Sequence, residues 1–121
     1  MSYIDGFVLC VPEEKLKEYK KMAAKAGKVW IRHGALQYVE AAGDDMKGNE
    51  FCMTFPALAQ PKKGEIVMFS FIIYKSRKHR DSVNKKVMAE MMKDGGDPEK
   101  CMEIFDVKRM AYGGFKALVA L

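Results

Sequence analysis

The sequence has few of the residues that build disulfide scaffolds and structural metal sites. Its three cysteines, Cys10, Cys52 and Cys101, are odd in number, far apart and contain no Cys-x-x-Cys pair. This spacing predicts reduced thiols in a cytoplasm and argues against structural zinc. Its two histidines, His33 and His79, have no second ligand three or four residues away. We therefore expect no metal site and no cofactor.

Long hydrophobic runs are also absent. The longest one extends from Ile66 to Ile73 with Ser70 inside it, which is far too short to cross a bilayer. The first residues, Met1 to Asp5, lack the basic start and apolar core of a signal peptide. The sequence therefore predicts a cytoplasmic protein with no membrane contact.

The chain instead carries an excess of positive charge on an ordinary globular composition. Its 121 residues suit a single domain spanning positions 1–121, and the net charge is +5. The cations concentrate in Lys15–Lys28 and Lys75–Lys86. This balance favours an anionic partner, either a metabolite or nucleic acid, although solvated helix faces explain the same charge.

The pattern of apolar residues and turn signals predicts two helices and four strands. The helices extend from Pro12 to His33, ended by Gly34, and from Arg77 to Met92, with Val83, Val87, Met88 and Met91 on its buried side. An irregular stretch covers Gly43–Gly64, and Asp94–Pro98 forms a loop. The expected strands are Tyr3–Val11, Ala35–Ala42, Glu65–Tyr74 and Arg109–Val119.

This order, β-α-β-β-α-β, predicts an α+β ferredoxin-like fold with a four-stranded antiparallel sheet. Right-handed crossovers then place the first strand between the third and fourth, with both helices on one face. We expect the helices to cover a face that includes Ile4, Val8, Val39, Phe71 and Phe115. The opposite face would carry Tyr3, Asp5, Tyr38, Glu40, Ser70 and Tyr74, among others, and would form a homodimer interface that encloses a pocket.

The start of the second helix breaks a local electrostatic rule. Ser76 suits the N-cap, so Arg77, Lys78, His79 and Arg80 occupy a first turn that is already positive. Free backbone N–H groups beside positive charge suit an anion, and a broken local rule often marks a functional site. Asp81, four residues after Arg77, would cancel part of this charge.

A family resemblance rests on segments spread over nearly the whole chain. The segments are Tyr3–Phe7, Ala26–Trp30, His33–Leu36, Tyr38–Glu40, Tyr74–Arg77, His79–Asp81, Val83–Asn84, Phe105–Asp106, Lys108–Met110 and Tyr112–Phe115. In this order they resemble the YbaA-like bacterial family of unknown function, and Asp94–Asp97 has no clear counterpart in the family pattern. The resemblance implies a dimeric α/β-barrel fold, whose superfamily includes cofactorless monooxygenases, isomerases, haem-degrading enzymes and stress-response proteins.

The candidate catalytic residues are His33 and His79, the two side chains suited to proton transfer near neutral pH. The alternatives are a structural role for His33 at a helix C-terminus and a surface position for His79. Asp5 and Glu40 are expected to pair with Lys116 or Arg109 across strands, and the alternative is a raised pKa suited to general acid–base catalysis. Candidate ligand-binding residues are Tyr38, Ser76, Arg77, Arg80, Asn84, Arg109 and Tyr112.

These features predict a homodimer that binds a small anionic or carbonyl-containing metabolite between the sheet and the start of the second helix. If it is an enzyme, cofactor-independent isomerase-like or monooxygenase-like chemistry fits best, and the sequence leaves open whether it is one. A structural or interaction module is the alternative. RNA binding is less favoured, because Tyr112–Val119 matches an RNA-recognition signature poorly and lies on the wrong strand.

Overall fold

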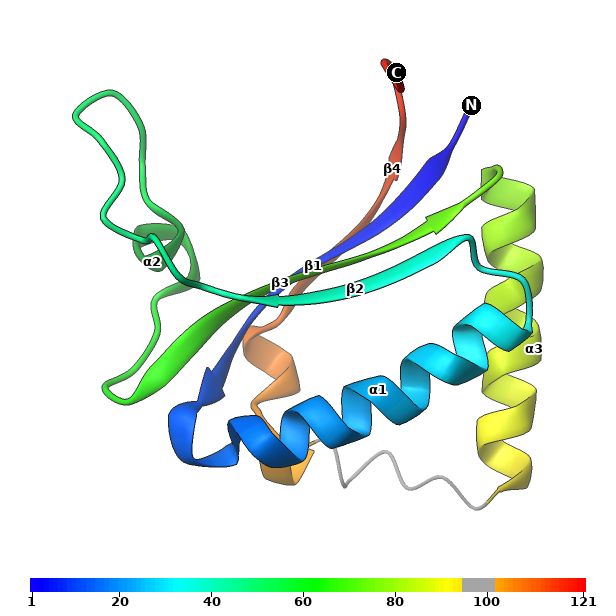
Figure 1. Cartoon of the computed structure of the whole chain (residues 1–121), viewed down its shortest axis with the longest axis horizontal. Coiled ribbons are helices and arrows are strands. Elements are labelled where there is room, and N and C mark those ends of the chain that lie inside the picture. Colours follow the sequence, from blue (N-terminus) through cyan, green and yellow to red (C-terminus); the bar gives the residue numbers. More distant parts are fainter. Residues whose placement is uncertain (95–101) are drawn as a thin grey trace.

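The computed structural model describes residues 1–94 and 102–121, and it has the predicted ferredoxin-like architecture. Four strands form one antiparallel sheet in the order β2-β3-β1-β4, so β1 lies between β3 and β4 as predicted. Figure 1 shows α1 and α3 on one side of this sheet. The elements are β1 (Tyr3–Pro12), η1 (Glu13–Lys15), α1 (Leu16–Arg32), β2 (Gln37–Ala42), α2 (Phe55–Ala59), β3 (Glu65–Tyr74), α3 (Arg77–Lys93), η2 (Val107–Arg109) and β4 (Ala111–Lys116).

The helix ends follow the local signals in the sequence. Ser76 is the N-cap of α3, and its hydroxyl accepts a hydrogen bond from the His79 backbone N–H. Gly34 follows α1 with a φ of 115°, a left-handed conformation that suits glycine.

Two segments differ from their predicted form, and a third is mostly outside the described residues. The stretch 43–64, predicted to be irregular, contains α2. Thr54 caps this short helix, and Pro56 lies in its first turn, where a proline is tolerated. The strand expected over Arg109–Val119 is shorter and follows the 3-10 turn η2. Apart from Asp94, the predicted loop Asp94–Pro98 lies outside the described residues.

The two faces of the sheet are reversed relative to the prediction. Ile72 and Tyr74 pack against Val83 and Val87 of α3, and Met68 packs against Tyr19 of α1. The helices therefore cover the tyrosine-rich face rather than the face that carries Phe71 and Phe115. The prediction failed because both faces are rich in apolar side chains, while the polar groups of the covered face find partners on the helices.

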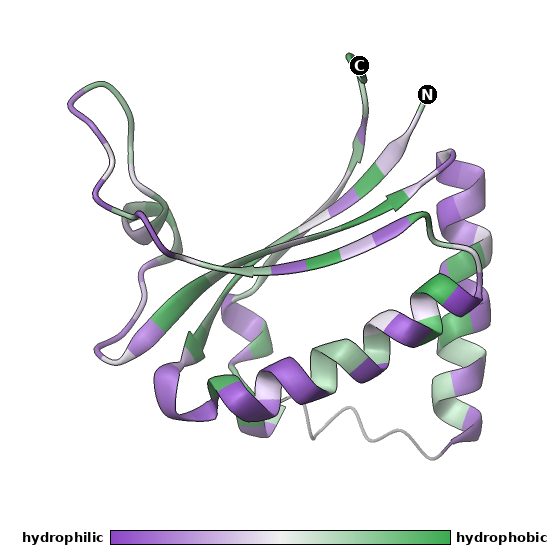
Figure 2. Ribbon diagram, viewed as in Figure 1, coloured by the Kyte–Doolittle hydropathy of each residue, from purple (hydrophilic) through white to green (hydrophobic). Residues whose placement is uncertain are grey.

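The face turned away from α1 and α3 stays largely open. Phe69 lies on the central strand β3, yet 44% of its surface is exposed, and Phe115 on β4 is 60% exposed. The end of this face is covered by α2, where Phe55 packs edge-on against Phe69. Figure 2 shows green, apolar segments along β1 and β3, and purple, polar segments over the first turns of α3. Met88, predicted to be buried in α3, is 49% exposed.

Candidate functional site

A buried ion pair joins the start of α3 to the sheet. Asp5 on β1 is 1% exposed, and its Oδ1 lies 2.9 Å from Nη1 of Arg80. The same nitrogen donates to the Tyr112 hydroxyl at 2.8 Å, and Arg80 Nε lies 2.8 Å from Asp81 Oδ1. The guanidinium also stands over the Tyr3 ring, 4.9 Å from its centroid. Two carboxylates therefore balance the charge of Arg80.

This ion pair corrects two predicted pairings. Asp5 does not pair with Lys116 or Arg109, because the helix-covered face brings α3 rather than a neighbouring strand to its carboxylate. Asp81 pairs with Arg80 instead of Arg77. Burial, reinforced by the charge of Asp5, also raises the pKa of the Tyr112 hydroxyl.

Asn84 on α3 connects three elements through its side-chain oxygen. Oδ1 accepts hydrogen bonds from Trp30 Nε1 at 3.0 Å and from the Tyr74 hydroxyl at 3.1 Å. Tyr74 is completely buried, and burial together with the nearby Asp5 raises the pKa of its hydroxyl. The hydroxyl therefore stays protonated and serves as a donor. The structure thus brings Asn84, Arg80 and Tyr112 into neighbouring contacts around Asp5 and Tyr74.

The first turn of α3 uses its polar groups locally. Ser76 caps the helix, and Nδ1 of His79 accepts a hydrogen bond from the Lys75 backbone N–H at 3.0 Å. The His79 ring stands edge-on to Tyr74. Arg77 is exposed. Anion binding by this turn stays a prediction, with Arg80 already paired.

His33 and Arg109 lie at separate places in the fold. His33 Nε2 is 2.9 Å from Glu90 Oε1, a contact that ties the end of α1 to α3. Arg109 binds Glu65 through both terminal nitrogens, at 3.0 and 2.8 Å, at the opposite end of β3 from His79. Hydrogen bonds from Arg109 lower the pKa of Glu65. The candidate residues His33, His79 and Arg109 therefore do not converge.

Glu40 on β2 forms a different kind of cluster. Its Oε2 accepts a hydrogen bond from the Tyr19 hydroxyl of α1, its Oε1 lies 3.4 Å from the Tyr38 hydroxyl, and Ser70 bonds to it as well. Burial raises the pKa of this carboxyl, and the three hydroxyl groups oppose that shift. The sequence placed Glu40 on the sheet face with Tyr38 but expected a cation as its partner.

A cavity of about 310 Å³ opens beside this carboxylate, between α1 and the sheet. Its wall is mostly apolar, with Glu40, the two tyrosines and the exposed Lys20 as its polar groups. The residues that line it include Leu16, Tyr19, Ala23, Tyr38, Glu40 and Met68.

The backbone of α1 shapes this cavity. A Cβ atom on Gly27 would lie 2.6 Å from Cδ1 of Tyr38, so the missing side chain lets the tyrosine ring lie directly on the helix. Trp30 of the same helix also lies beside Tyr38, with the two ring centroids 6.1 Å apart. β-Sheet register sets Glu40 opposite Ser70. The Gly27–Tyr38 contact was missed, since only the tertiary fold brings these residues together.

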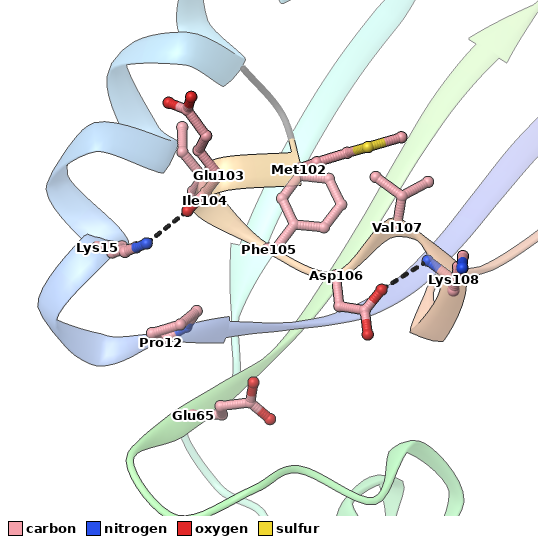
Figure 3. A pocket seen from close by; sticks show the side chains of 10 residues that line it. All are labelled: Pro12, Lys15, Glu65, Met102, Glu103, Ile104, Phe105, Asp106, Val107 and Lys108. Atoms are coloured by element: carbon pink, nitrogen blue, oxygen red, sulfur yellow. Dashed lines mark hydrogen bonds between the residues drawn. The ribbon is translucent and has the colours of Figure 1, made fainter. Parts of the chain in front are cut away.

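A second cavity, of about 300 Å³, lies beside the start of α1, between the turn at Lys15 and residues 102–108 (Figure 3). Lys15 donates to the backbone oxygen of Glu103 there, and Asp106 caps the backbone N–H of Lys108. These polar groups are used in local contacts that stabilise the chain. We place no site in it.

Among residues 1–94 and 102–121, no group of three or more His, Cys, Asp or Glu side chains is arranged to hold a metal ion. The same part of the chain contains no helix long and apolar enough to span a membrane.

Known proteins resemble this chain in both sequence and fold. YbaA of Escherichia coli K12 is 38% identical over 120 residues, covering 98% of each chain, and YbaA of Shigella flexneri matches equally. Among solved structures, a dimeric ferredoxin-like protein from an uncultured marine organism aligns with a TM-score of 0.52 at 12% identity, covering 100% of this chain and 98% of its own.

The designed protein Foldit4 aligns with a TM-score of 0.50 at 12% identity, covering 97% of this chain and 99% of its own. These structural matches support the ferredoxin-like fold. The model of the family described as "Protein of unknown function (DUF1428)" matches residues 2–106, and the chain belongs to that family.

Proposed function

We propose that this protein works as a homodimer whose protomers each bind a small metabolite in the cavity between α1 and the sheet. The observation that carries the dimer is the apolar sheet face left open by the helices. A phenylalanine on a central strand is normally buried, yet Phe69 is 44% exposed. Packing two such faces together would bury it.

The central part of the open face suits a second copy of the same chain. Across all four strands its side chains are aliphatic or aromatic and carry no charge. An uncharged apolar patch is self-complementary under two-fold symmetry, where each protomer presents the same surface. The marine ferredoxin-like protein is described as dimeric, which supports a dimer for this chain. The residues of this part are Ile4, Val8, Val39, Ala41, Phe69, Phe71, Ile73 and Phe115.

Light scattering on a sizing column tests the dimer. The wild-type protein should have twice the 13.7 kDa mass of one chain. Phe69→Lys places a charge in the interface and should give the mass of one chain. Met92→Lys is the matched control, because Met92 is 81% exposed on α3, away from this face. A wild-type mass of one chain, or a Phe69→Lys variant that stays dimeric while circular dichroism shows it folded, would contradict the proposal.

The cavity beside Glu40 supports the ligand-binding part. At about 310 Å³ it lies at the lower end of the size range of small-molecule sites. It also combines an apolar wall with a few convergent polar groups, as such sites do. A metabolite screen by thermal shift should give ligands that stabilise the wild type, by about 2.7 kcal/mol at a hundred times Kd.

The variant Ala24→Trp should remove this stabilisation, because Ala24 lines the cavity and a larger ring would fill it. Lys25→Trp, one residue along the same helix and exposed, is its control. Hits that stabilise the Ala24→Trp variant as strongly as the wild type would contradict this location.

A further inference from the structure

We propose that the cavity between α1 and the sheet takes a small organic cation, whose ammonium group is bound by the Glu40 carboxylate between Tyr19 and Tyr38. This inference rests on the proposed function in one respect, that the cavity is the ligand site. It adds the chemical class of the ligand. The proposed ligand is positively charged, whereas the sequence predicted an anion at the start of α3.

The first argument is the set of partners around Glu40. Tyr19, Tyr38 and Ser70 are all neutral hydroxyl donors. Within the described residues, no lysine, arginine or histidine forms an ion pair with this carboxylate. A carboxylate oxygen has about two lone-pair positions, so three donors leave room for a further hydrogen-bond donor.

The other partly or fully buried carboxylates among residues 1–94 and 102–121 differ in this respect. Asp5 pairs with Arg80, Glu65 with Arg109, and Glu90 with Arg32 and His33. Each of these three carboxylates therefore has a cationic partner, whereas Glu40 has none among the described residues. A ligand cation would complete the same pattern at Glu40.

The charges around the cavity favour this ligand. Lys20 of α1 also lines the cavity, but its side chain is exposed and forms no ion pair with Glu40 among the described residues. The titratable groups that face Glu40 are Tyr19 from α1 and Tyr38 from β2, with the neutral Ser70 from β3. Burial disfavours the charged form of Glu40, as its raised pKa records, and a bound cation would relieve that cost.

The walls set the size and shape of the ligand. Two tyrosine rings flank the carboxylate, and an ammonium group gains further stabilisation beside such rings. Leu16, Ala23 and Met68 offer an apolar surface. A space of about 310 Å³ fits an amine with one ring or a short aliphatic chain, rather than a nucleotide.

Calorimetric titration with three related probes tests the inference. Phenethylamine is a cation at neutral pH, 2-phenylethanol is its neutral counterpart, and phenylacetate is the anion. The wild type should bind the amine at least about tenfold more tightly than the alcohol, and the alcohol more tightly than the acid. Lowering the pH should weaken amine binding as Glu40 becomes protonated.

The variant Glu40→Gln keeps the shape of the side chain and removes its charge. It should bind amine and alcohol within about twofold of each other, losing the tenfold preference. The control variant Glu18→Gln, at an exposed position of α1, should keep the preference. The pH titration of the wild type provides the same comparison without a substitution.

Two results would overturn the inference, and they separate it from the proposed function. Equal affinity for amine and alcohol, abolished by Ala24→Trp, would leave the cavity as a ligand site and remove its charge preference. Failure of the amine to bind at about 10 mM would also overturn it. The dimer mass is a separate measurement, so a monomeric wild type would contradict that part of the proposed function alone.

Discussion

Asp5 and Glu40 lie on the same face of the sheet, and the fold treats them differently. Asp5 is almost fully buried and is bound by the guanidinium of Arg80 at 2.9 Å. Glu40 is bound by the hydroxyl groups of Tyr19, Tyr38 and Ser70, and it borders a cavity. One carboxylate is compensated by charge and the other by hydrogen bonds alone.

The difference separates a carboxylate whose charge is used in an ion pair within the fold from one whose charge has no cationic partner. Arg80 comes from the start of α3, so its ion pair with Asp5 fixes that helix to β1 and uses up both charges. Among the described residues, no cationic side chain forms an ion pair with Glu40. Its charge is therefore open to a partner from solution, which is the basis of the cation proposal.

The largest effect is expected when the buried ion pair is broken. Arg80→Met keeps much of the side-chain length but leaves Asp5 as an unpaired buried charge, which should lower the free energy of unfolding by about 3–5 kcal/mol. Urea denaturation followed by circular dichroism measures this. Arg77→Met, in the same turn but exposed, should change stability by at most about 0.5 kcal/mol.

Replacing both members of the pair sharpens this prediction. Asp5→Asn combined with Arg80→Met removes the stranded charge, so the double variant should be more stable than Arg80→Met alone. A single Arg80→Met variant as stable as the wild type would show that Asp5 finds compensation elsewhere.

A smaller loss is expected from Gly27→Ala. The new Cβ would lie 2.6 Å from the Tyr38 ring, and such overpacking costs about 1–3 kcal/mol. This cost exceeds the gain of about 1 kcal/mol in helix propensity. A thermal melt should show destabilisation, and displacement of Tyr38 should weaken amine binding.

Lys28→Ala, at the next and exposed position of α1, should leave both the melt and the amine affinity nearly unchanged. If Gly27→Ala instead raises the melting temperature, the Tyr38 ring has moved away at little cost, and the shape of the cavity does not depend on that glycine.

The smallest effect is a difference in pH dependence between two carboxylates. Burial raises the pKa of Glu40 above the ordinary 4.5, so its contribution to stability is lost as pH rises through the raised pKa. Hydrogen bonds from Arg109 lower the pKa of Glu65 below 4.5, so its contribution is lost as pH falls through the lowered pKa.

The two glutamine variants should therefore diverge in opposite directions. From pH 4 towards neutral, in the range set by those two pKa values, Glu40→Gln should gain stability relative to the wild type while Glu65→Gln should lose it. Melting temperatures across this range measure both. If the melting temperatures of the two variants change with pH in parallel, the predicted contrast between Glu65, which is paired with Arg109, and Glu40, which has no cationic partner, is wrong.

The sequence by itself determined the elements and their order. Short-range signals fixed the ends of helices: the hydroxyl of Ser76 caps α3, and Gly34 takes the left-handed conformation after α1. Crossover handedness then placed β1 between β3 and β4. These features depend on neighbours within a few residues or on general rules of chain connection. The short helix α2 was missed because its length gives almost no periodic signal.

Only the tertiary structure decided which sheet face the helices cover and which carboxylate keeps an uncompensated charge. Alternation separates the side chains of β1 and β3 into two sets, but both sets are apolar, so the pattern does not say which one meets α1 and α3. The partners of Asp5 and Glu40 are 75 and 21 residues away in the sequence, at Arg80 and Tyr19. Such pairings depend on how the helices dock, and no local pattern contains that information.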